Sequence, residues 1–191
     1  MSRERTYFIN GLPALYEAWK KAGREEEGKK ILENFLVQSF KSDLPEKIER
    51  FLKTGINPIP SDLRYFAIYS ELVQLYVNGL YYSTVVLAGT LCERICFDIL
   101  SLQKIQVGDK PLSAEQISCL YDRDISKNLK LLYSWGLIEK ESNDEMFQIY
   151  QRRIDYAHPK MKGINPKKDS FNMIKKITKI LINEFVKKPE R

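Results

Sequence analysis

Apolar residues recur every three or four positions along most of the chain, the spacing that places them on one face of an α-helix. No stretch alternates apolar and polar residues over a convincing strand length. The pattern therefore predicts an all-α protein. The predicted helices cover, in chain order, residues 12–20, 24–40, 45–53, 63–77, 81–103, a short segment after Pro111, and residues 125–135, 142–158 and 166–187.

Residues 81–103 form the most apolar of these predicted helices, because Glu93 and Arg94 alone interrupt the apolar circumference over residues 81–96. A helix that is apolar nearly all round is expected at the centre of a bundle. Ala88 and Gly89 on this helix would let a neighbouring backbone approach closely. Propensity alone also fits a strand over residues 81–87, but the helical stripe continues to residue 99, so we retain the helix.

Two other helices are expected to bury an apolar stripe. For residues 24–40 the stripe is Ile31, Leu32, Phe35 and Leu36. For residues 142–158 it is Met146, Phe147, Tyr150, Ile154 and Ala157.

Short-range signals locate several helix ends. Asp124 is a predicted N-cap for residues 125–135, and Gly136 follows as the left-handed residue common after a helix. Ser142 and Glu145 have the spacing of a capping box, which predicts a helix start there. Asn165 and Pro166 are typical of the first positions of a last helix.

The two prolines of the segment 57–60 are the clearest break in the helical pattern, because they remove backbone donors and fix an extended connection. We therefore predict an N-terminal helical extension over residues 1–58 and a helical bundle over residues 59–191.

Composition narrows the class of protein. With 43% apolar residues and no apolar run of membrane-spanning length, the chain is expected to be a globular cytoplasmic protein with no membrane partner. Its three cysteines favour free thiols over a disulfide framework, and Cys92 and Cys96 are expected to be buried. No metal and no cofactor are predicted.

The net charge of +6 is unevenly distributed along the chain. From Arg152 to the end there are 12 basic and 4 acidic residues, whereas residues 1–151 carry 19 basic and 21 acidic residues. A local positive excess fits either a nucleic-acid-binding surface or a solvated lysine face. The candidate phosphate-binding residues are Arg152, Lys160, Lys162, Lys168, Lys175, Lys176 and Lys179.

The excess begins beside the single histidine of the chain, in the sequence Arg153-Ile154-Asp155-Tyr156-Ala157-His158-Pro159. A residue before proline is driven away from helical dihedrals, so His158 is expected at the helix end and free to turn toward Arg153. The carbonyl end of a helix favours the imidazolium form, which suits proton exchange near neutral pH. Tyr156 is expected to be a packed aromatic residue.

An arginine followed by four residues and a histidine, near the end of a core helix that precedes a final helix, resembles the motif of the HEPN superfamily of all-helical domains. The order of the helices from residue 61 to residue 187 is similar as well, including Glu93 and Arg94 on the central helix. The resemblance implies a HEPN-like bundle that acts as a homodimer and cleaves single-stranded RNA without a metal. Toxin, stress or phage defence is the implied context.

The resemblance further implies that His158 is the acid or base and that Arg153 holds the phosphate. Active families usually have a polar residue directly after the arginine, whereas this chain has Ile154. Two alternatives therefore stay open. In the first, Arg153 pairs with an acid such as Glu93 and His158 caps its helix. In the second, the domain is an inactive module that binds RNA, a nucleotide or, through residues 1–58, a partner protein.

Overall fold

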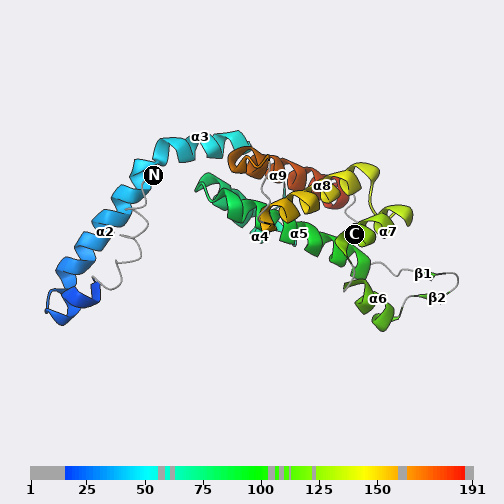
Figure 1. Cartoon of the computed structure of the whole chain (residues 1–191), viewed down its shortest axis with the longest axis horizontal. Coiled ribbons are helices and arrows are strands. Elements are labelled where there is room, and N and C mark those ends of the chain that lie inside the picture. The colour runs from blue at the N-terminus through cyan, green and yellow to red at the C-terminus, as the bar shows by residue number, and fades with distance from the viewer. Residues whose placement is uncertain are drawn as a thin grey trace. The chain divides into compact units, whose positions relative to one another are not determined.

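The computed structural model confirms the all-α class (Figure 1). Among the described residues, β1 (Gln106–Val107) and β2 (Lys110–Pro111) form the one departure, a small antiparallel hairpin within the connection that precedes α6. The structure describes residues 16–55, 59–60, 63–102, 106–107, 110–111, 113–121, 124–158 and 163–187.

The chain divides into two compact units, residues 1–48 and residues 49–191. In the first unit, residues 16–21 are helical and Gly23, with a φ of 73°, ends this helix before α2 (Glu25–Ser42). Gly28 of α2 is buried against the ring of Trp19.

The predicted apolar stripe of α2 is only partly covered. The side chains of Ile31 and Leu36 are 42% and 62% exposed. Val37 and Phe40 of the same helix are exposed as well. An amphipathic pattern does not reveal whether the chain itself supplies a cover for the apolar face, and α2 leaves much of this face in solvent.

Helix α3 (Leu44–Thr54) contains the division between the units, ten residues before the boundary at residues 58 and 59 suggested by the prolines. Arg50 accounts for the difference. Its side chain is buried, and its Nε donates a hydrogen bond of 2.7 Å to the carbonyl of Val77 at the end of α4. A cation is favoured beside the carbonyl end of a helix, so the second half of α3 is attached to the bundle.

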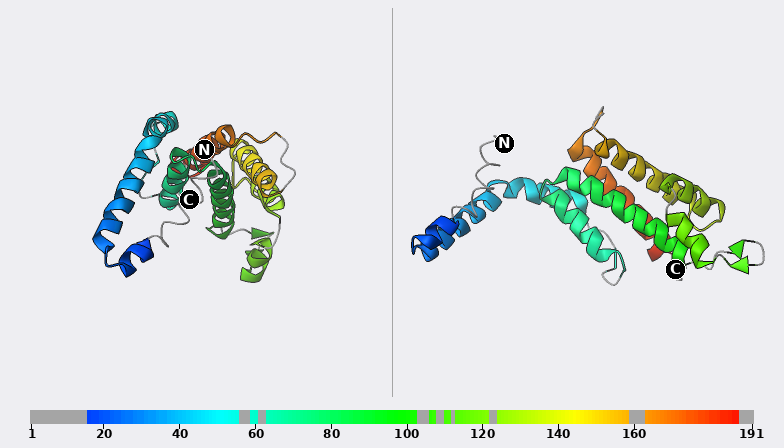
Figure 2. Two further views of the ribbon diagram at one scale, coloured as in Figure 1. Left: turned by 60° about the vertical axis from the view of Figure 1, so that its left-hand side comes forward. Right: turned by 60° about the horizontal axis from the view of Figure 1, so that its bottom comes forward.

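The second unit is a bundle arranged around α5 (Tyr81–Leu102). This helix packs against α4 (Phe66–Val77), α7 (Ile125–Ser134), α8 (Lys140–Ala157) and α9 (Pro166–Leu181), with α6 (Ala114–Tyr121) at its far end. The views in Figure 2 show α5 between α4 and α8. The predicted central position of α5 is thus correct. Its inward residues Val85, Ala88, Leu91 and Ile95 are fully buried.

Most of the predicted helix ends are confirmed. The carboxylate of Asp124 accepts a hydrogen bond of 2.7 Å from the amide of Ser126, and Gly136 has a φ of 67° after α7. Asn165 accepts a bond of 3.1 Å from the amide of Lys168 and so caps α9. Ser61 or Asp62 can cap the helix predicted over residues 63–77, but both lie outside the described residues.

The predicted capping box at Ser142 is wrong, because α8 begins at Lys140 and buries Ser142. The carboxylate of Glu184 accepts a hydrogen bond of 3.0 Å from the amide of Glu139, the residue before α8. Glu184 belongs to a π-helical turn, Ile182–Val186, that follows α9. A buried carboxylate from a remote segment therefore replaces the local cap.

The thiols of Cys92 and Cys96 are buried as predicted, and Cys119 is exposed. Burial raises the pKa of the Cys92 thiol and raises that of Cys96 to about 12, so both are protonated at neutral pH. Among the described residues, no helix combines the length and the apolar character needed to cross a membrane.

Candidate functional site

The carboxyl end of α8 carries the only histidine of the chain. Ala157 is the last residue of α8, and His158 takes the extended dihedrals φ −105° and ψ 142° that a following proline favours. Its amide donates to the carbonyl of Ile154 at 3.1 Å, so its backbone completes the last turn. The His158 side chain is exposed, and its imidazole bonds to no described residue. It is therefore accessible to a ligand at the helix end.

Arg153 lies one turn earlier and faces α5. One nitrogen of its guanidinium, Nη1, donates to the carboxylate of Glu93. No other hydrogen bond from this guanidinium to the described residues is found, and the Arg153 side chain is 32% exposed. The pairing with Glu93 is one of the two arrangements that the sequence left open. Glu93 fixes the direction of the guanidinium and leaves its other N–H groups available.

Gly89 provides the space in which Arg153 lies. A Cβ atom at position 89 would be 2.2 Å from Cδ of Arg153 and 2.9 Å from its Cβ. No side chain is tolerated at such distances without movement of the arginine or of the helix. A close approach does occur at Gly89, but the predicted neighbouring backbone is wrong, because the approaching group is the side chain of Arg153 on α8.

Arg152 faces α9 instead, and both terminal nitrogens of its guanidinium donate hydrogen bonds. It donates to Asp169 at 2.8 Å, to Asp155 at 3.2 Å and to the carbonyl of Gly163 at 3.3 Å. The bonds to Asp169 and Gly163 connect the end of α8 to the start of α9.

Asp169 is the centre of that connection. Its Oδ2 atom also accepts bonds from the hydroxyl of Tyr156 at 2.9 Å and from the amide of Asn165 at 3.0 Å. Burial raises the pKa of the Asp169 carboxyl, but the bonds from Arg152, Asn165 and Tyr156 outweigh it and hold the pKa below its usual range. Tyr156 is a packed aromatic residue as predicted, since its ring also meets Tyr82 edge-on with centroids 5.0 Å apart.

Two of the candidate phosphate-binding lysines have acidic partners on α8. Lys176 pairs with Glu145, and Lys179 bonds to Glu141 at 2.7 Å and to Glu145 at 3.2 Å. Burial raises the pKa of Glu145, but the two ammonium groups outweigh it, so the carboxyl titrates below its ordinary value. This side of the bundle is therefore much less positive than the sequence count suggests.

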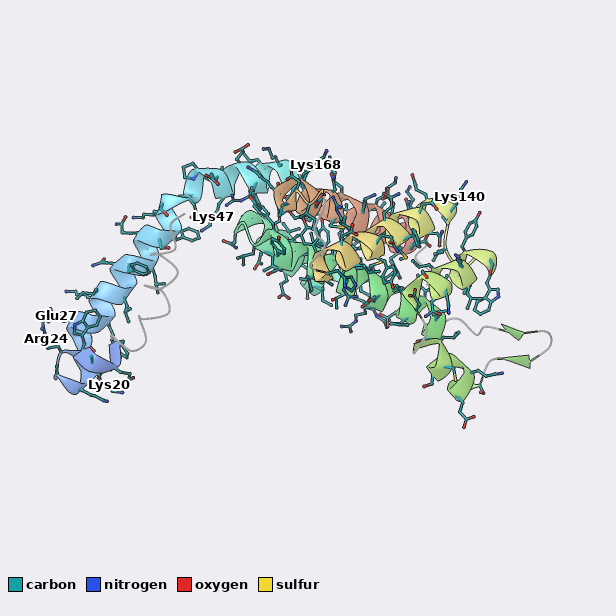
Figure 3. All side chains as sticks on the ribbon, viewed as in Figure 1. Lys20, Arg24, Glu27, Lys47, Lys140 and Lys168 are labelled. Carbon is teal, nitrogen blue, oxygen red and sulfur yellow. The ribbon has the colours of Figure 1, made fainter. Side chains whose placement is uncertain are left out.

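The other candidate phosphate-binding lysines differ in their surroundings. Lys168 is exposed near the start of α9, at the end of the helical pair opposite Lys140 (Figure 3). Lys175 is exposed with its ammonium 4.5 Å from the centroid of the Phe171 ring. Lys160 and Lys162 lie outside the described residues. Lys168 and Lys175 are thus the candidates with no carboxylate partner among the described residues.

Two open grooves flank α8. One, of about 490 Å³, lies toward α9 and is lined by Glu145, Gln148, Asn172, Lys175, Lys176 and Lys179. The other, of about 320 Å³, lies toward α7 and is lined by Ser126, Leu129, Lys130, Asn143, Asp144, Phe147 and Gln148.

The groove toward α7 contains residues that the sequence did not single out. Phe147 was expected in the buried stripe of its helix, but its side chain is 39% exposed. The buried side of α8 instead consists of Ser142, Met146, Ile149 and Tyr156. Because polar Ser142 lies on the buried side and Phe147 on the open side, the apolar pattern gave the wrong orientation of this helix. The sequence signal for an exposed Phe147 was its place among polar residues, between Asp144 and Gln148.

The chain matches no family model, no curated protein and no solved structure in the comparisons made.

Proposed function

We propose that the protein is a metal-independent endoribonuclease of the HEPN type that acts as a homodimer on single-stranded RNA. The observation that supports this is the pair at the end of α8. His158 has an exposed imidazole with no partner among the described residues, and Arg153 presents a guanidinium held through one nitrogen only. These are the two group types that metal-free phosphodiester cleavage requires.

The reaction consists of one displacement at phosphorus. The 2′-oxygen forms a bond to phosphorus while the bond from phosphorus to the 5′-oxygen breaks. One histidine takes the proton of the 2′-hydroxyl, and a second group delivers a proton to the leaving 5′-oxygen. The products are a 2′,3′-cyclic phosphate and a free 5′-hydroxyl. Because one chain supplies a single histidine, a dimer supplies both proton-transfer groups as two copies of His158.

Arg153 stabilises the negative charge that grows on the phosphate oxygens during this displacement. Glu93 is a positioning residue in this proposal. It holds Nη1 and so aims the remaining N–H groups of the guanidinium away from α5. Gly89 leaves the stem of Arg153 room against α5. The proposed reaction uses no cofactor, and a cytoplasmic toxin, stress or defence role is the context that the resemblance of the motif implies.

One observation favours a second candidate, an inactive HEPN-like module that binds RNA, a nucleotide or a protein. The carboxylate of Glu93 neutralises much of the charge of Arg153, and the half-buried Ile154 supplies no polar group beside it. The exposed apolar residues Ile31, Leu36 and Phe40 of α2 offer a surface for a protein partner in that case.

An RNA cleavage assay in the presence of EDTA separates the two candidates. We expect wild-type protein to produce 2′,3′-cyclic phosphate ends, His158→Ala to lose about 100-fold or more of the rate, and Arg153→Lys to lose a similar factor. Gln151→Ala is the matched control, since Gln151 is an exposed polar residue of the same helix. Failure of the wild type to cut any of a diverse set of single-stranded RNAs would contradict the proposal and favour the module.

Mixing variants tests the shared site. A heterodimer of wild-type and His158→Ala chains retains one of the two histidines, so its activity should fall far below half of the wild-type value if both copies act on one phosphate, and should stay near half if each protomer acts alone. Light scattering on the same mixture verifies that a dimer is present.

A further inference from the structure

Helix α5 is the centre of the bundle, yet one side of its first half is open. Tyr82 and Val86 are each 47% exposed, and Leu80, the residue before the helix, is 51% exposed. Ser83 and Thr90 are exposed on the same side of the helix as Val86. Neighbouring exposed apolar side chains mark interaction surfaces in soluble proteins. We call the surface formed by Leu80, Tyr82 and Val86 the α5 face.

The α5 face carries no charge. No Asp, Glu, Lys or Arg occurs between Glu71 and Glu93 in the sequence. Binding of a nucleic acid strand depends on cations that neutralise its phosphates, so the strand itself is not expected to cover this face. An uncharged face can meet its own copy without placing like charges opposite each other.

The charges that flank the α5 face occur in pairs. On the side toward α8, the guanidinium of Arg153 pairs with the carboxylate of Glu93. On the side toward α4, Arg94 lies 3.9 Å from the carboxylate of Asp98. A second copy of the chain therefore meets both signs of charge at the edge of the contact, which suits a self-complementary interface.

Tyr82 is held in place before any partner arrives. Its ring meets the ring of Tyr156 edge-on, with centroids 5.0 Å apart. The hydroxyl of Tyr156 in turn donates to the buried carboxylate of Asp169 at 2.9 Å. A half-exposed tyrosine that is already fixed loses little conformational freedom on binding, which is the property of an interface anchor.

The contact between Tyr82 and Tyr156 also connects the α5 face to the candidate site. Tyr156 lies two residues before His158, so the face reaches the end of α8. When two copies of α5 pair in opposite directions about Tyr82, both α8 helices lie on the same side of the contact and their ends approach each other. The single histidine of each chain then has a second copy nearby, which the proposed displacement requires.

We propose that the α5 face is the surface on which a second copy of this chain docks, in an antiparallel pairing of the two α5 helices centred on Tyr82. The pairing completes the candidate site, because each copy contributes one α8 end to it. The assignment names the partner in the proposed nuclease function and rests on that function for the need for two histidines.

Light scattering over a range of protein concentrations tests the α5 face. We expect the wild type to have twice the 22.4 kDa mass of one chain. Val86→Glu places a carboxylate of each copy in the contact without lowering helix propensity, so it should raise the dissociation constant about 100-fold or more and leave the helical circular dichroism unchanged. Val37→Glu is the matched control, since Val37 is a 41% exposed valine on α2.

Tyr82→Glu is the second test of the same face. A carboxylate is favourable in the first turn of a helix, so α5 should stay intact while the dimer dissociates. Tyr133→Glu is its control, because Tyr133 is a 45% exposed tyrosine on α7. A dimer that survives both Val86→Glu and Tyr82→Glu would overturn the proposal, and so would a monomeric wild type. Dissociation by Val37→Glu in their place would assign the contact to α2.

The docking face and the nuclease fail in different ways. If the wild type cleaves RNA and Val86→Glu remains a dimer, the face is wrong and the nuclease stands. If Val86→Glu dissociates a wild-type dimer that cuts no RNA, the face stands and the nuclease is wrong. If the dissociated Val86→Glu chain cleaves at the full rate, the face stands and the shared site is wrong.

Discussion

Arg152 and Arg153 are sequence neighbours on α8, yet the two sides of the helix that they occupy are organised in opposite ways. On the α9 side, Arg152 meets three acceptors, and Lys176 and Lys179 meet two carboxylates. On the α5 side, Arg153 meets one carboxylate and keeps part of its surface in solvent. A charge with several protein partners connects helices, whereas a charge with a single partner keeps more of its donors for a ligand. The number of basic residues alone does not separate these two cases.

The largest effect on stability is expected from removing the carboxylate of Asp169 on the α9 side of α8. Asp169→Ala leaves Arg152, the Tyr156 hydroxyl and the Asn165 amide without their common acceptor. Loss of such a buried partner costs about 3 kcal/mol of the free energy of unfolding, measured by chemical denaturation. Asp155→Ala removes an exposed partner of the same arginine and should cost about 0.5 kcal/mol. Equal losses in the two variants would contradict the central role of Asp169.

The same carboxylate predicts a pH dependence. Its pKa is lower in the folded protein than the ordinary value of about 4, so its stabilising contribution is complete above that value and is lost as the pH falls through the folded pKa. We expect thermal stability to fall on the acid side of pH 4. Asp169→Asn should flatten this decline, and an unchanged acid limb in that variant would show that other carboxyls cause it.

A smaller effect is expected on the open side, at Gly89. Gly89→Ala adds a methyl group 2.2 Å from Cδ of Arg153, which outweighs the higher helix propensity of alanine and costs about 2 kcal/mol. In an Arg153→Gly background neither Cδ nor Cβ of residue 153 is present, so this clash is absent and the same substitution should stabilise by up to about 1 kcal/mol. Denaturation of the four proteins of this cycle measures the reversal of sign. Additive effects would mean that Gly89 and Arg153 do not touch.

These contacts mark the limit of what the sequence reveals. Asp124, Gly136 and Asn165 were found because each acts within a few residues of itself. The start of α8 was misplaced because its cap, Glu184, is 45 residues away from Glu139. A local motif at Ser142 competed with that distant carboxylate, and the tertiary contact determined the outcome.

The candidate site shows the same distinction. The close approach at Gly89 and the pairing of Arg153 with Glu93 could be anticipated, because small and charged residues on a central helix limit what can pack against it. The neutralisation of Lys176 and Lys179 could not, since it depends on the rotation of α8 relative to α9. The same rotation exposes Phe147, which the apolar pattern assigned to the core.

Removing a carboxylate from the α9 side of α8 tests the difference between the α9 and α5 sides further. Glu145→Gln removes the carboxylate that Lys176 and Lys179 share, while Lys179 keeps its pairing with Glu141, and should cost less than about 1 kcal/mol of stability. RNA affinity at low salt should rise severalfold, with a steeper dependence on salt concentration. Unchanged affinity would show that the α9 side of α8 does not contact the strand.

The smallest change in stability is expected at His158. The imidazole is exposed and bonds to no described residue, so His158→Ala should alter the free energy of unfolding by less than about 0.5 kcal/mol. A thermal melt of this variant is the control for its loss of cleavage. A large drop in melting temperature would instead assign His158 to structure.

The contact between Arg153 and Gly89 also limits which residues related proteins can carry at these two positions. A protein with any larger residue in place of Gly89 cannot hold an arginine against α5 in this way, because the Cβ atom at position 89 would overlap Cδ of the arginine. Glycine on the central helix and arginine on α8 are thus expected to be inherited and lost together. Related sequences can be sorted by this pair, and those that keep both residues are expected to share the site.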